Sequence, residues 1–280
     1  MGENETAWRI LPVGDFHIGV ETDEEGLHPR YDEYVRDEKD AVERKLTLWR
    51  LLTDSINALD LDYVVFLGDN FGKFSEANCE VLKDLFKDLR CPVIGVMGNH
   101  DAGQRLADGT WPPDYWLERR KRISEDVFGH DVCAGFDLRG GWRLILLNNA
   151  TPIARDRYMF TIADEDLSFL ESELARGLPC VTVMHVPFRF PKAYATMCHR
   201  RIYEKPADQR RLDSIPRQFM YPPMQEKLNA LRKKHANWRG NIAGHVHYYA
   251  CDEEDGFTQW TFPIWPERSD PLRCLDVHDF

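Results

Sequence analysis

Residues 63–69 read YVVFLGD, an apolar run that ends at a glycine and an acid. Similar apolar runs stand at 92–96 (PVIGV), 144–147 (LILL) and 181–184 (VTVM). Short apolar runs of this kind are typical of strands that are buried on both faces of a sheet. Three of them lead directly into a polar motif, so we expect functional residues just past the carboxyl ends of strands, where open α/β sheets place their sites.

Helices are expected between these strands. Three segments repeat apolar residues every three or four positions, which is typical of helices with one buried face: 37–58, 76–89 and 164–175. Three later segments favour successive antiparallel strands: 238–251, 257–264 and 274–277. Alternating strands and helices followed by a strand-rich end predict a layered α/β domain.

Length and composition narrow the class of protein. The chain has 280 residues and a net charge of −11, and its length suits one domain spanning 1–280. It shows neither a signal-like start nor an apolar run of membrane-spanning length, so a cytoplasmic protein without membrane contact is expected. The seven cysteines lack paired spacing, which favours reduced thiols. The acidity makes nucleic acid an unlikely partner, because affinity for a phosphate backbone comes largely from Lys and Arg.

Five short polar clusters stand in order along the chain. Their side chains include the two carboxylates, one amide and four imidazoles that two adjacent catalytic metal ions require. A carboxylate has two oxygens and can bridge two ions, and Asp69 is the natural bridge. The clusters are Asp15-Phe16-His17, Gly68-Asp69-Asn70, Gly98-Asn99-His100-Asp101, His185 and Gly244-His245-Val246-His247.

Spacing within the clusters gives two further expectations. Asp15 and His17 are two residues apart, as are His245 and His247, so in extended backbone each pair faces one side. A glycine precedes Asp69, Asn99 and His245, and glycine permits a tight turn there.

The ordered set closely resembles the calcineurin-like metallophosphoesterase superfamily, whose pattern is D-x-H, G-D, G-N-H-D/E, H and G-H-x-H. The match runs from residue 15 to residue 247. The resemblance implies an α/β/β/α sandwich, in which two mixed β-sheets are flanked by helices and a dinuclear metal site lies at the strand ends.

The resemblance also implies a role for each matching residue. One metal ion would be bound by Asp15, His17, Asp69 and His247, and the other by Asp69, Asn99, His185 and His245. His100 would remain free of metal and face the substrate, where it stabilises the transition state or protonates the leaving oxygen. Asp101 would orient the ring of His100.

The branch of the superfamily is indicated less directly. Residues 136–148 (FDLRGGWRLILLN), followed by a Leu-rich helix and by His185-Val186-Pro187, are similar to the cyclic-nucleotide phosphodiesterase and nucleotide-pyrophosphatase branch. Protein Ser/Thr phosphatases extend the Gly-Asp motif as G-D-x-V-D-R-G, which is not found here. Purple acid phosphatases have a metal-binding tyrosine where this chain has Gly72.

The expected reaction is hydrolysis of a phosphodiester or phosphomonoester of a small, nucleotide-like substrate by a metal-bridging hydroxide. Two divalent ions are implied, with manganese or iron favoured over zinc. The physiological substrate, the preference between diester and monoester, and the oligomeric state stay open.

Two alternatives come from other function classes. The D-x-H-x-G start at 15–19 is similar to that of DNA-repair-type nucleases, although such an enzyme would need a local basic groove on this acidic chain. A non-catalytic metal-binding scaffold would keep the fold for binding partners. That reading predicts lost ligands or a replaced His100, and neither is found.

Three segments are candidates for contact with the substrate. Residues 189–223 form a possible substrate-facing insertion whose basic side chains could clamp a phosphate or equally pair with nearby acids. The candidates there are His199, Arg200 and Arg201. Residues 21–44 favour a solvated loop and helix start, but could line the site entrance. The aromatic residues of 111–116 could stack on a base or pack against the following helix.

Overall fold

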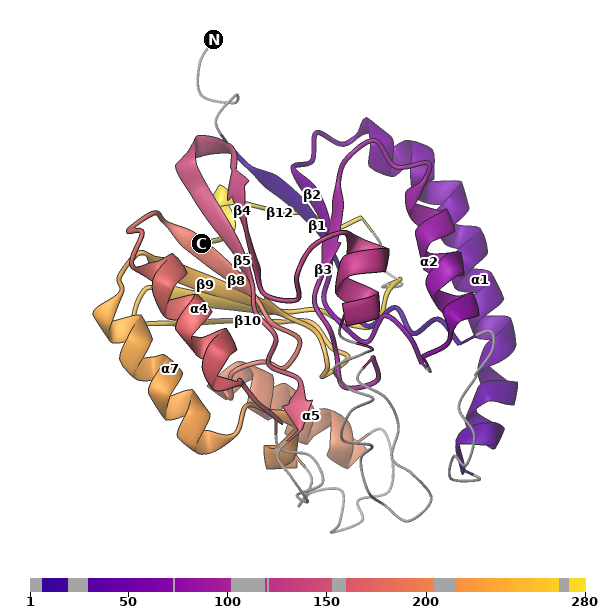
Figure 1. The fold of residues 1–280 in the computed structure, drawn as a ribbon. Helices are drawn as coiled ribbons and strands as arrows, with labels where there is room; N and C mark the ends of the chain where they lie inside the picture. The colour runs from indigo at the N-terminus through magenta and orange to yellow at the C-terminus, as the bar shows by residue number, and fades with distance from the viewer. Residues whose placement is uncertain are drawn as a thin grey trace.

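The computed structural model describes residues 7–19, 30–72, 74–101, 119, 121–152, 160–203, 215–266 and 272–280, and gives the backbone alone for 30–41, 152, 200–203 and 217. Two mixed β-sheets face each other, and helices cover the outer face of each (Figure 1). This is the α/β/β/α sandwich expected from the sequence.

The first sheet has the strand order β12-β1-β2-β3. Its strands are β1 (Arg9–Val13), β2 (Tyr63–Phe66), β3 (Val93–Gly95) and β12 (Leu275–Asp276). The first three run parallel, while β12 pairs antiparallel with β1. Three helical segments accompany this sheet: α1 (Arg30–Ala58), α2 (Glu76–Phe86) and the π-helical η1 (Arg122–Phe128). Core residues of all three, among them Trp49, Leu82 and Val127, pack together with Phe66 of β2.

The second sheet has the order β10-β11-β9-β8-β5-β4. Its strands are β4 (Ala134–Leu138), β5 (Trp142–Leu146), β8 (Cys180–Val183), β9 (Trp238–Ala243), β10 (Ala250–Glu254) and β11 (Phe257–Thr261). Helices α4 (Asp164–Leu174) and α7 (Pro222–Lys234) pack on it through Leu170 and Leu228. The remaining elements are η2 (Arg139–Gly141), β6 (Thr151–Pro152), β7 (Phe160–Thr161), α5 (Pro191–Tyr203), η3 (Ile215–Gln218) and η4 (Val277–Asp279).

The apolar runs form strands because both of their faces are buried. In β2, Val64 and Phe66 point toward α1 and α2, whereas Val65 and the following Leu67 point into the space between the sheets. Side chains alternate between the two faces of a strand, so a strand covered on both sides needs an apolar residue at every position. The four predicted apolar runs therefore coincide with β2, β3, β5 and β8.

The predicted helices are present with shifted ends. α1 begins at Arg30, before the predicted residue 37, and α2 ends at Phe86, before the predicted residue 89. The side chain of Ser75 accepts a hydrogen bond from the amide of Asn78 and so caps the first turn of α2.

The prediction of successive antiparallel strands at the end of the chain is wrong in part. β11 lies between β9 and β10 and runs parallel to β9, and β12 joins the other sheet. After β9, the loop 244–249 leads to β10, which leaves room for one strand between them. A hairpin at Asp255 and Gly256 then brings β11 into that place. Both hairpin residues have positive φ, at 53° and 73°. This arrangement gives β11 a hydrogen-bonded partner on each side.

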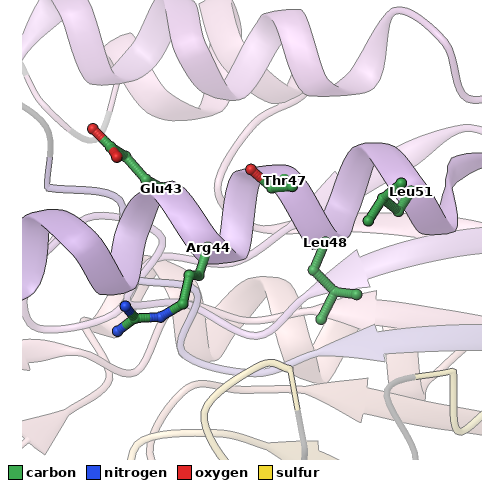
Figure 2. Close-up of a pocket in the computed structure, with 5 residues that line it drawn as sticks. All are labelled: Glu43, Arg44, Thr47, Leu48 and Leu51. Atoms are coloured by element: carbon green, nitrogen blue, oxygen red, sulfur yellow. The ribbon is translucent and has the colours of Figure 1, made fainter.

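Two further features concern the surface and the thiols. Leu51 is 72% exposed on the outer side of α1, in a pocket that it shares with Glu43, Arg44, Thr47 and Leu48 (Figure 2). All seven cysteines are free thiols. In the described part of the chain, none of the helices has the length and apolar character needed to cross a membrane.

Candidate metal centre

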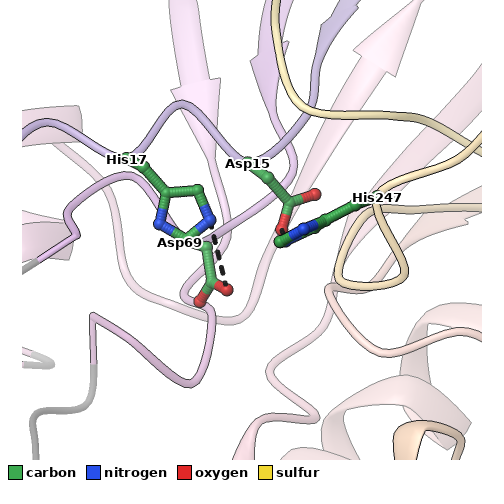
Figure 3. Close-up of side chains that lie close together, drawn as sticks. All are labelled: Asp15, His17, Asp69 and His247. Carbon is green, nitrogen blue, oxygen red and sulfur yellow. Dashed lines mark ion pairs between the residues drawn. The ribbon is translucent and has the colours of Figure 1, made fainter. Parts of the chain in front are cut away.

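The predicted ligands follow four strands that belong to both sheets. Asp15 and Asp69 come just after β1 and β2, while His185 and His245 come just after β8 and β9. In two overlapping groups, potential ligand atoms lie within 4.8 Å of one another. The first group is Asp15, His17, Asp69 and His247, whose side chains converge in Figure 3, and the second is Asp69, His185 and His245. Asp69 belongs to both groups, as a bridging carboxylate must.

The backbone at these positions is strained. Six non-glycine residues in the described part of the chain have positive φ, and five of them are predicted ligands. Their φ values are 41° for Asp15, 50° for His17, 48° for Asp69, 67° for His245 and 58° for His247. Left-handed conformations cost non-glycine residues free energy and tend to persist at functional sites.

These left-handed turns correct the expectation of extended backbone within the Asp-x-His and His-x-His motifs. Asp15 and His17 do fall in one group, but His245 and His247 fall in different groups. Each of the two groups therefore receives one imidazole from the His-x-His loop.

The glycines of the motifs serve two different purposes. Gly68 has a φ of +89° and supports the expected tight turn. A Cβ atom at Gly98 would lie 2.1 Å from Asp69 Oδ1, and one at Gly244 would lie 2.6 Å from Asp15 Oδ2. These two glycines therefore leave room for the carboxylates.

Hydrogen bonds tie together the two loops of the first sheet. The amide of His17 donates to the carbonyl of Asp69 (2.9 Å), and the amide of Ile18 donates to that of Asn70 (2.8 Å). From α1, Lys45 Nζ donates to the carbonyl of Phe16 at 3.0 Å. The motifs did not point to Lys45, because its contact depends on how α1 packs against the loop.

His185 links the two sheets and presents one defined nitrogen to the site. Its Nδ1 donates to the carbonyl of Leu67 at 2.8 Å. Its Nε2 faces Asp69 Oδ1 at 3.3 Å, Asn99 Oδ1 at 3.1 Å and His245 Nδ1 at 3.2 Å. A backbone acceptor at one ring nitrogen fixes the tautomer and leaves the other nitrogen to act as a ligand.

The charges in the site shift several pKa values. Burial alone would raise the pKa of Asp69, but the surrounding histidines, His185 first, outweigh it and hold that pKa well below its usual range. Burial would lower the pKa of His185, but the Asp69 carboxylate outweighs it and raises the value to about 9. Burial and neighbouring histidines lower the pKa values of His17 and His245.

The donor set fits a pair of divalent cations. Both ring nitrogens of His17 and Nε2 of His245 are buried without a hydrogen-bond partner among the described residues. Buried polar atoms normally have partners, and a cation accepts the lone pair of a neutral imidazole nitrogen. The Asp69 carboxylate favours a proton on His185, and a cation held by both residues would take the place of that proton. Mixed imidazole and carboxylate donors suit manganese, iron or zinc.

His100 lies beside this donor set but outside both groups. Its ring centroid is 4.9 Å from that of His17, in an edge-to-face arrangement. Its amide donates to Asp69 Oδ1 at 2.8 Å, and its Nδ1 is 3.3 Å from the carbonyl of Gly72. The ring is thus anchored through Nδ1.

The expected orientation of the His100 ring by Asp101 stays a prediction, and the hydrogen bonds of the Asp101 carboxylate join the two loops 68–72 and 98–101. Its Oδ1 accepts from the amide of Phe71 (2.9 Å), and its Oδ2 accepts from Asn70 Nδ2 (2.9 Å) and the amide of Gly98 (2.8 Å). Burial and the charge of Asp69 raise the pKa of Asp101 to about 7 against these donors. Asp101 therefore ties the loop that carries Asp69 to its own loop.

Asn70 is a partner in this arrangement that the sequence analysis left without a role. Besides Asp101, its Nδ2 donates to the carbonyl of Val96 at 3.0 Å, at the end of β3. The available signal was its position directly after Asp69.

Helix α5, within the basic segment 189–223, packs beside the His-x-His loop. Val246 and Tyr248 form an apolar cluster with Ala193 and Met197 of α5, and the Tyr248 hydroxyl donates to the carbonyl of Ala193. Asp252 of β10 accepts from the first amides of α5, at 2.7 and 2.9 Å.

The structure gives a partial view of the predicted substrate contacts. His199 is exposed near the end of α5, and Arg200 and Arg201 are placed by their backbone alone. The aromatic residues of 111–116, and residues 20–29 and 204–214, lie outside the described residues.

Comparison with known proteins agrees with this geometry. A profile of the calcineurin-like phosphoesterase family matches residues 9–249, which include every predicted ligand. A probable cyclic nucleotide phosphodiesterase of Synechococcus sp. is 27% identical over 127 residues, or 45% of this chain. The chain spans 42% of the length of that curated relative.

Solved structures share the fold at low sequence identity. The phosphopantetheinyl hydrolase of Mycobacterium tuberculosis matches 98% of this chain and 96% of its own, with a TM-score of 0.51 and 13% identity. GAP50, an anchor in the inner membrane complex of Plasmodium, matches 92% of this chain and 72% of its own, with a TM-score of 0.50 and 13% identity. A hydrolase and an anchor are thus both similar in fold to this chain.

Proposed function

The chain belongs to the calcineurin-like phosphoesterase family, and on that premise we propose that it is a dinuclear metal-dependent hydrolase of small, nucleotide-like phosphate esters that prefers diesters to monoesters. One observation carries the proposal. Two groups of potential ligand atoms share Asp69, at the point where the carboxyl ends of strands from both sheets meet.

In this proposal, Asp15, His17, Asp69 and His247 hold one divalent ion, and Asp69, Asn99, His185 and His245 hold the other. Manganese or iron is the favoured metal. When bound, the ions polarise the phosphoryl group and acidify the attacking water. The contact of His185 with Leu67 keeps its Nε2 directed at Asp69, so the side chain is oriented in advance.

His100 is the proposed catalytic acid. Its Nδ1 is occupied by the carbonyl of Gly72, so Nε2 is the nitrogen that would stabilise the phosphoryl oxygens or give a proton to the leaving oxygen. Asp101 acts on His100 from a distance, by holding the loops 68–72 and 98–101 together. We therefore assign Asp101 a positioning role.

We further propose that residues 1–280 act as one domain and that the segment 189–223 is a substrate-facing insertion. The packing of α5 against Val246 and Tyr248 supports this, because Val246 lies between two predicted ligands. His199, Arg200 and Arg201 near the end of α5 are the candidates for contact with phosphate. The name of the Synechococcus relative, which matches less than half of this chain, supports the diester preference.

Hydrolysis of two model substrates tests the proposal. The chelated protein would be reconstituted separately with manganese, iron and zinc, then assayed with bis-p-nitrophenyl phosphate and p-nitrophenyl phosphate. We expect faster diester hydrolysis that requires the metal. In the variant His100→Ala, the rate should fall on the order of 10²- to 10⁴-fold while both metals are retained, because a proton donor is lost and no ligand is removed.

Each other outcome has a defined meaning. Faster monoester hydrolysis would replace the diester preference with a phosphatase activity. Loss of metal from His100→Ala would show that His100 is a ligand. Inactivity in a protein that binds no metal would overturn the hydrolase proposal and favour the scaffold reading.

A further inference from the structure

The segment His185–Phe188 leaves the end of β8 without a neighbouring strand, yet its backbone is extensively bonded. The amide of Gly244 donates to the carbonyl of His185 at 3.1 Å, and the amide of Met220 donates to that of Pro187 at 3.1 Å. The backbone groups of Val186 are met by one side chain and those of Phe188 by another, and the Phe188 carbonyl also accepts from the amide of Phe190 at 2.9 Å. Backbone groups buried outside regular structure require such partners.

The side chain of Asn149 contacts both backbone groups of Val186. Its Nδ2 donates to the Val186 carbonyl at 2.6 Å, and its Oδ1 accepts from the Val186 amide at 3.0 Å. Asn149 is fully buried and lies just after β5, the strand beside β8. The amide side chain therefore takes the place of a strand partner beyond the point where β5 ends.

The side chain of Gln259 repeats this arrangement two residues further on. Its Oε1 accepts from the Phe188 amide at 2.7 Å, and its Nε2 donates to the Phe188 carbonyl at 3.1 Å. Asn241 Nδ2 also donates to Gln259 Oε1 at 3.3 Å, and Thr182 Oγ1 donates to Asn241 Oδ1 at 3.0 Å. All three side chains are fully buried, and Gln259 is held in place by Asn241 of β9, which is itself bonded to Thr182 of β8.

We propose that Asn149 and Gln259 form an amide clamp on His185–Phe188, and that Asn149 is a positioning residue for the metal subsite of Asp69, Asn99, His185 and His245. The proposal rests on the dinuclear function proposed above. Val186 directly follows His185, so fixing both of its backbone groups limits the directions in which the imidazole can leave the site. The contact of Nδ1 with Leu67 then fixes the rotation of the ring.

The neighbouring residue provides a matched control. Asn148 is also fully buried, but its Nδ2 donates to Asp166 Oδ2 at 3.1 Å and Thr151 Oγ1 at 3.3 Å, away from the His185 segment. Asn148→Ala and Asn149→Ala remove the same side chain from adjacent buried positions, and both should reduce stability. A difference between them in metal affinity isolates the clamp.

Calorimetric titration of the chelated full chain with Mn²⁺ tests the proposal. We expect two binding events in the wild type. In Asn149→Ala, the dissociation constant of one event should rise about 10- to 100-fold while the other is unchanged, which is the range found for partners of metal ligands. Asn148→Ala should leave both constants unchanged. In Gln259→Ala the affected constant should rise less, since Phe188 is further from His185.

Several outcomes would overturn the proposal. Equal changes in Asn148→Ala and Asn149→Ala, or none in either, would reduce Asn149 to a structural residue. If Asn149→Ala fails to fold, Asn149→Asp provides the same test, since it keeps the acceptor for the Val186 amide and loses the donor. Fewer than two binding events in the wild type would instead overturn the dinuclear function, so the two failures are distinguishable.

Discussion

The two sheets are joined by polar side chains at both ends, and the two junctions are built in opposite ways. At the amino ends of the strands, Arg139 from the β4–β5 turn meets Asp60 and Asp62, which precede β2. Arg139 Nη2 lies 2.9 Å from Asp62 Oδ2, and the amide of Arg9 also donates to that oxygen at 2.8 Å. We call Asp60, Asp62 and Arg139 the amino-end junction.

The carboxyl-end junction is the candidate metal centre, made of the seven predicted ligands. Its hydrogen-bonding groups are only partly satisfied, since His17 and His245 have buried ring nitrogens without a hydrogen bond among the described residues. Five of its residues also have left-handed backbone, whereas none of the three amino-end residues does. The amino-end junction is complete in itself and should serve stability, while the carboxyl-end junction would be completed by cations and should serve function.

The largest expected effect comes from removing the shared carboxylate of the carboxyl-end junction. Asp69→Asn should lower kcat/KM for the diester on the order of 10³-fold, because it removes the one anion that both groups contain. Addition of Mn²⁺ should raise the melting temperature of the wild type but not of the variant, since only a ligand that binds the folded state stabilises it. Calorimetric melting and the diester assay measure both effects.

Asp166→Asn is the control, because Asp166 is a buried acid outside the centre that accepts a hydrogen bond from Asn148. It should reduce stability and keep the Mn²⁺-dependent rise in melting temperature. Full activity of Asp69→Asn with two bound ions would contradict the division between the two junctions.

The sequence predicts the donor types of the carboxyl-end junction better than its backbone. The apolar runs at 63–67 and 181–184 placed Asp69 and His185 just past strand ends, where open α/β sheets have their sites, and both residues lie there. The left-handed turns could not be predicted from the sequence, because an Asp or a His does not by itself indicate positive φ. A glycine in a tight turn often does. Extended backbone was therefore expected where the structure has none.

Contacts between distant loops could not be predicted from the sequence either. The sequence predicts that Asp101 orients the adjacent His100, but it does not reveal the donors from Phe71, Asn70 and Gly98 that the carboxylate meets once the loops have come together. The position of β11 between β9 and β10 has the same cause. Local alternation shows that a segment is a strand, but the partner of that strand is chosen by tertiary packing.

The amino-end junction should respond in the opposite way to the metal centre. Arg139→Ala should lower the free energy of unfolding by about 1–3 kcal/mol, because it leaves the largely buried carboxylate of Asp62 with fewer charged donors. Activity and Mn²⁺ affinity should be unchanged. Urea unfolding gives the stability and calorimetric titration gives the affinity.

Arg176→Ala supplies the matched control for Arg139→Ala. Arg176 is 43% exposed and pairs with Glu173 at 3.3 Å, so its loss should cost at most about 1 kcal/mol, as for other surface ion pairs. A change of Mn²⁺ affinity in Arg139→Ala would show that the two ends of the sheets are coupled and would end the separation of roles.

The smallest expected effect concerns a second ion pair at the amino ends, in which Arg143 Nε lies 2.6 Å from Glu173 Oε2. Burial would raise the pKa of Glu173, but Arg143 outweighs it and holds that pKa below the ordinary value of 4.5. The ionised carboxylate therefore stabilises the fold fully above pH 4.5, and this contribution is lost as the pH falls through the folded-state pKa. Glu173→Gln should cost about 1 kcal/mol at pH 7 and progressively less in acid. Urea unfolding of both proteins, followed by tryptophan fluorescence from pH 7 down to about pH 3.5, measures the difference. An equal cost at every pH would mean that Glu173 acts through its shape, and a cost that grows in acid would reverse the sign of the linkage.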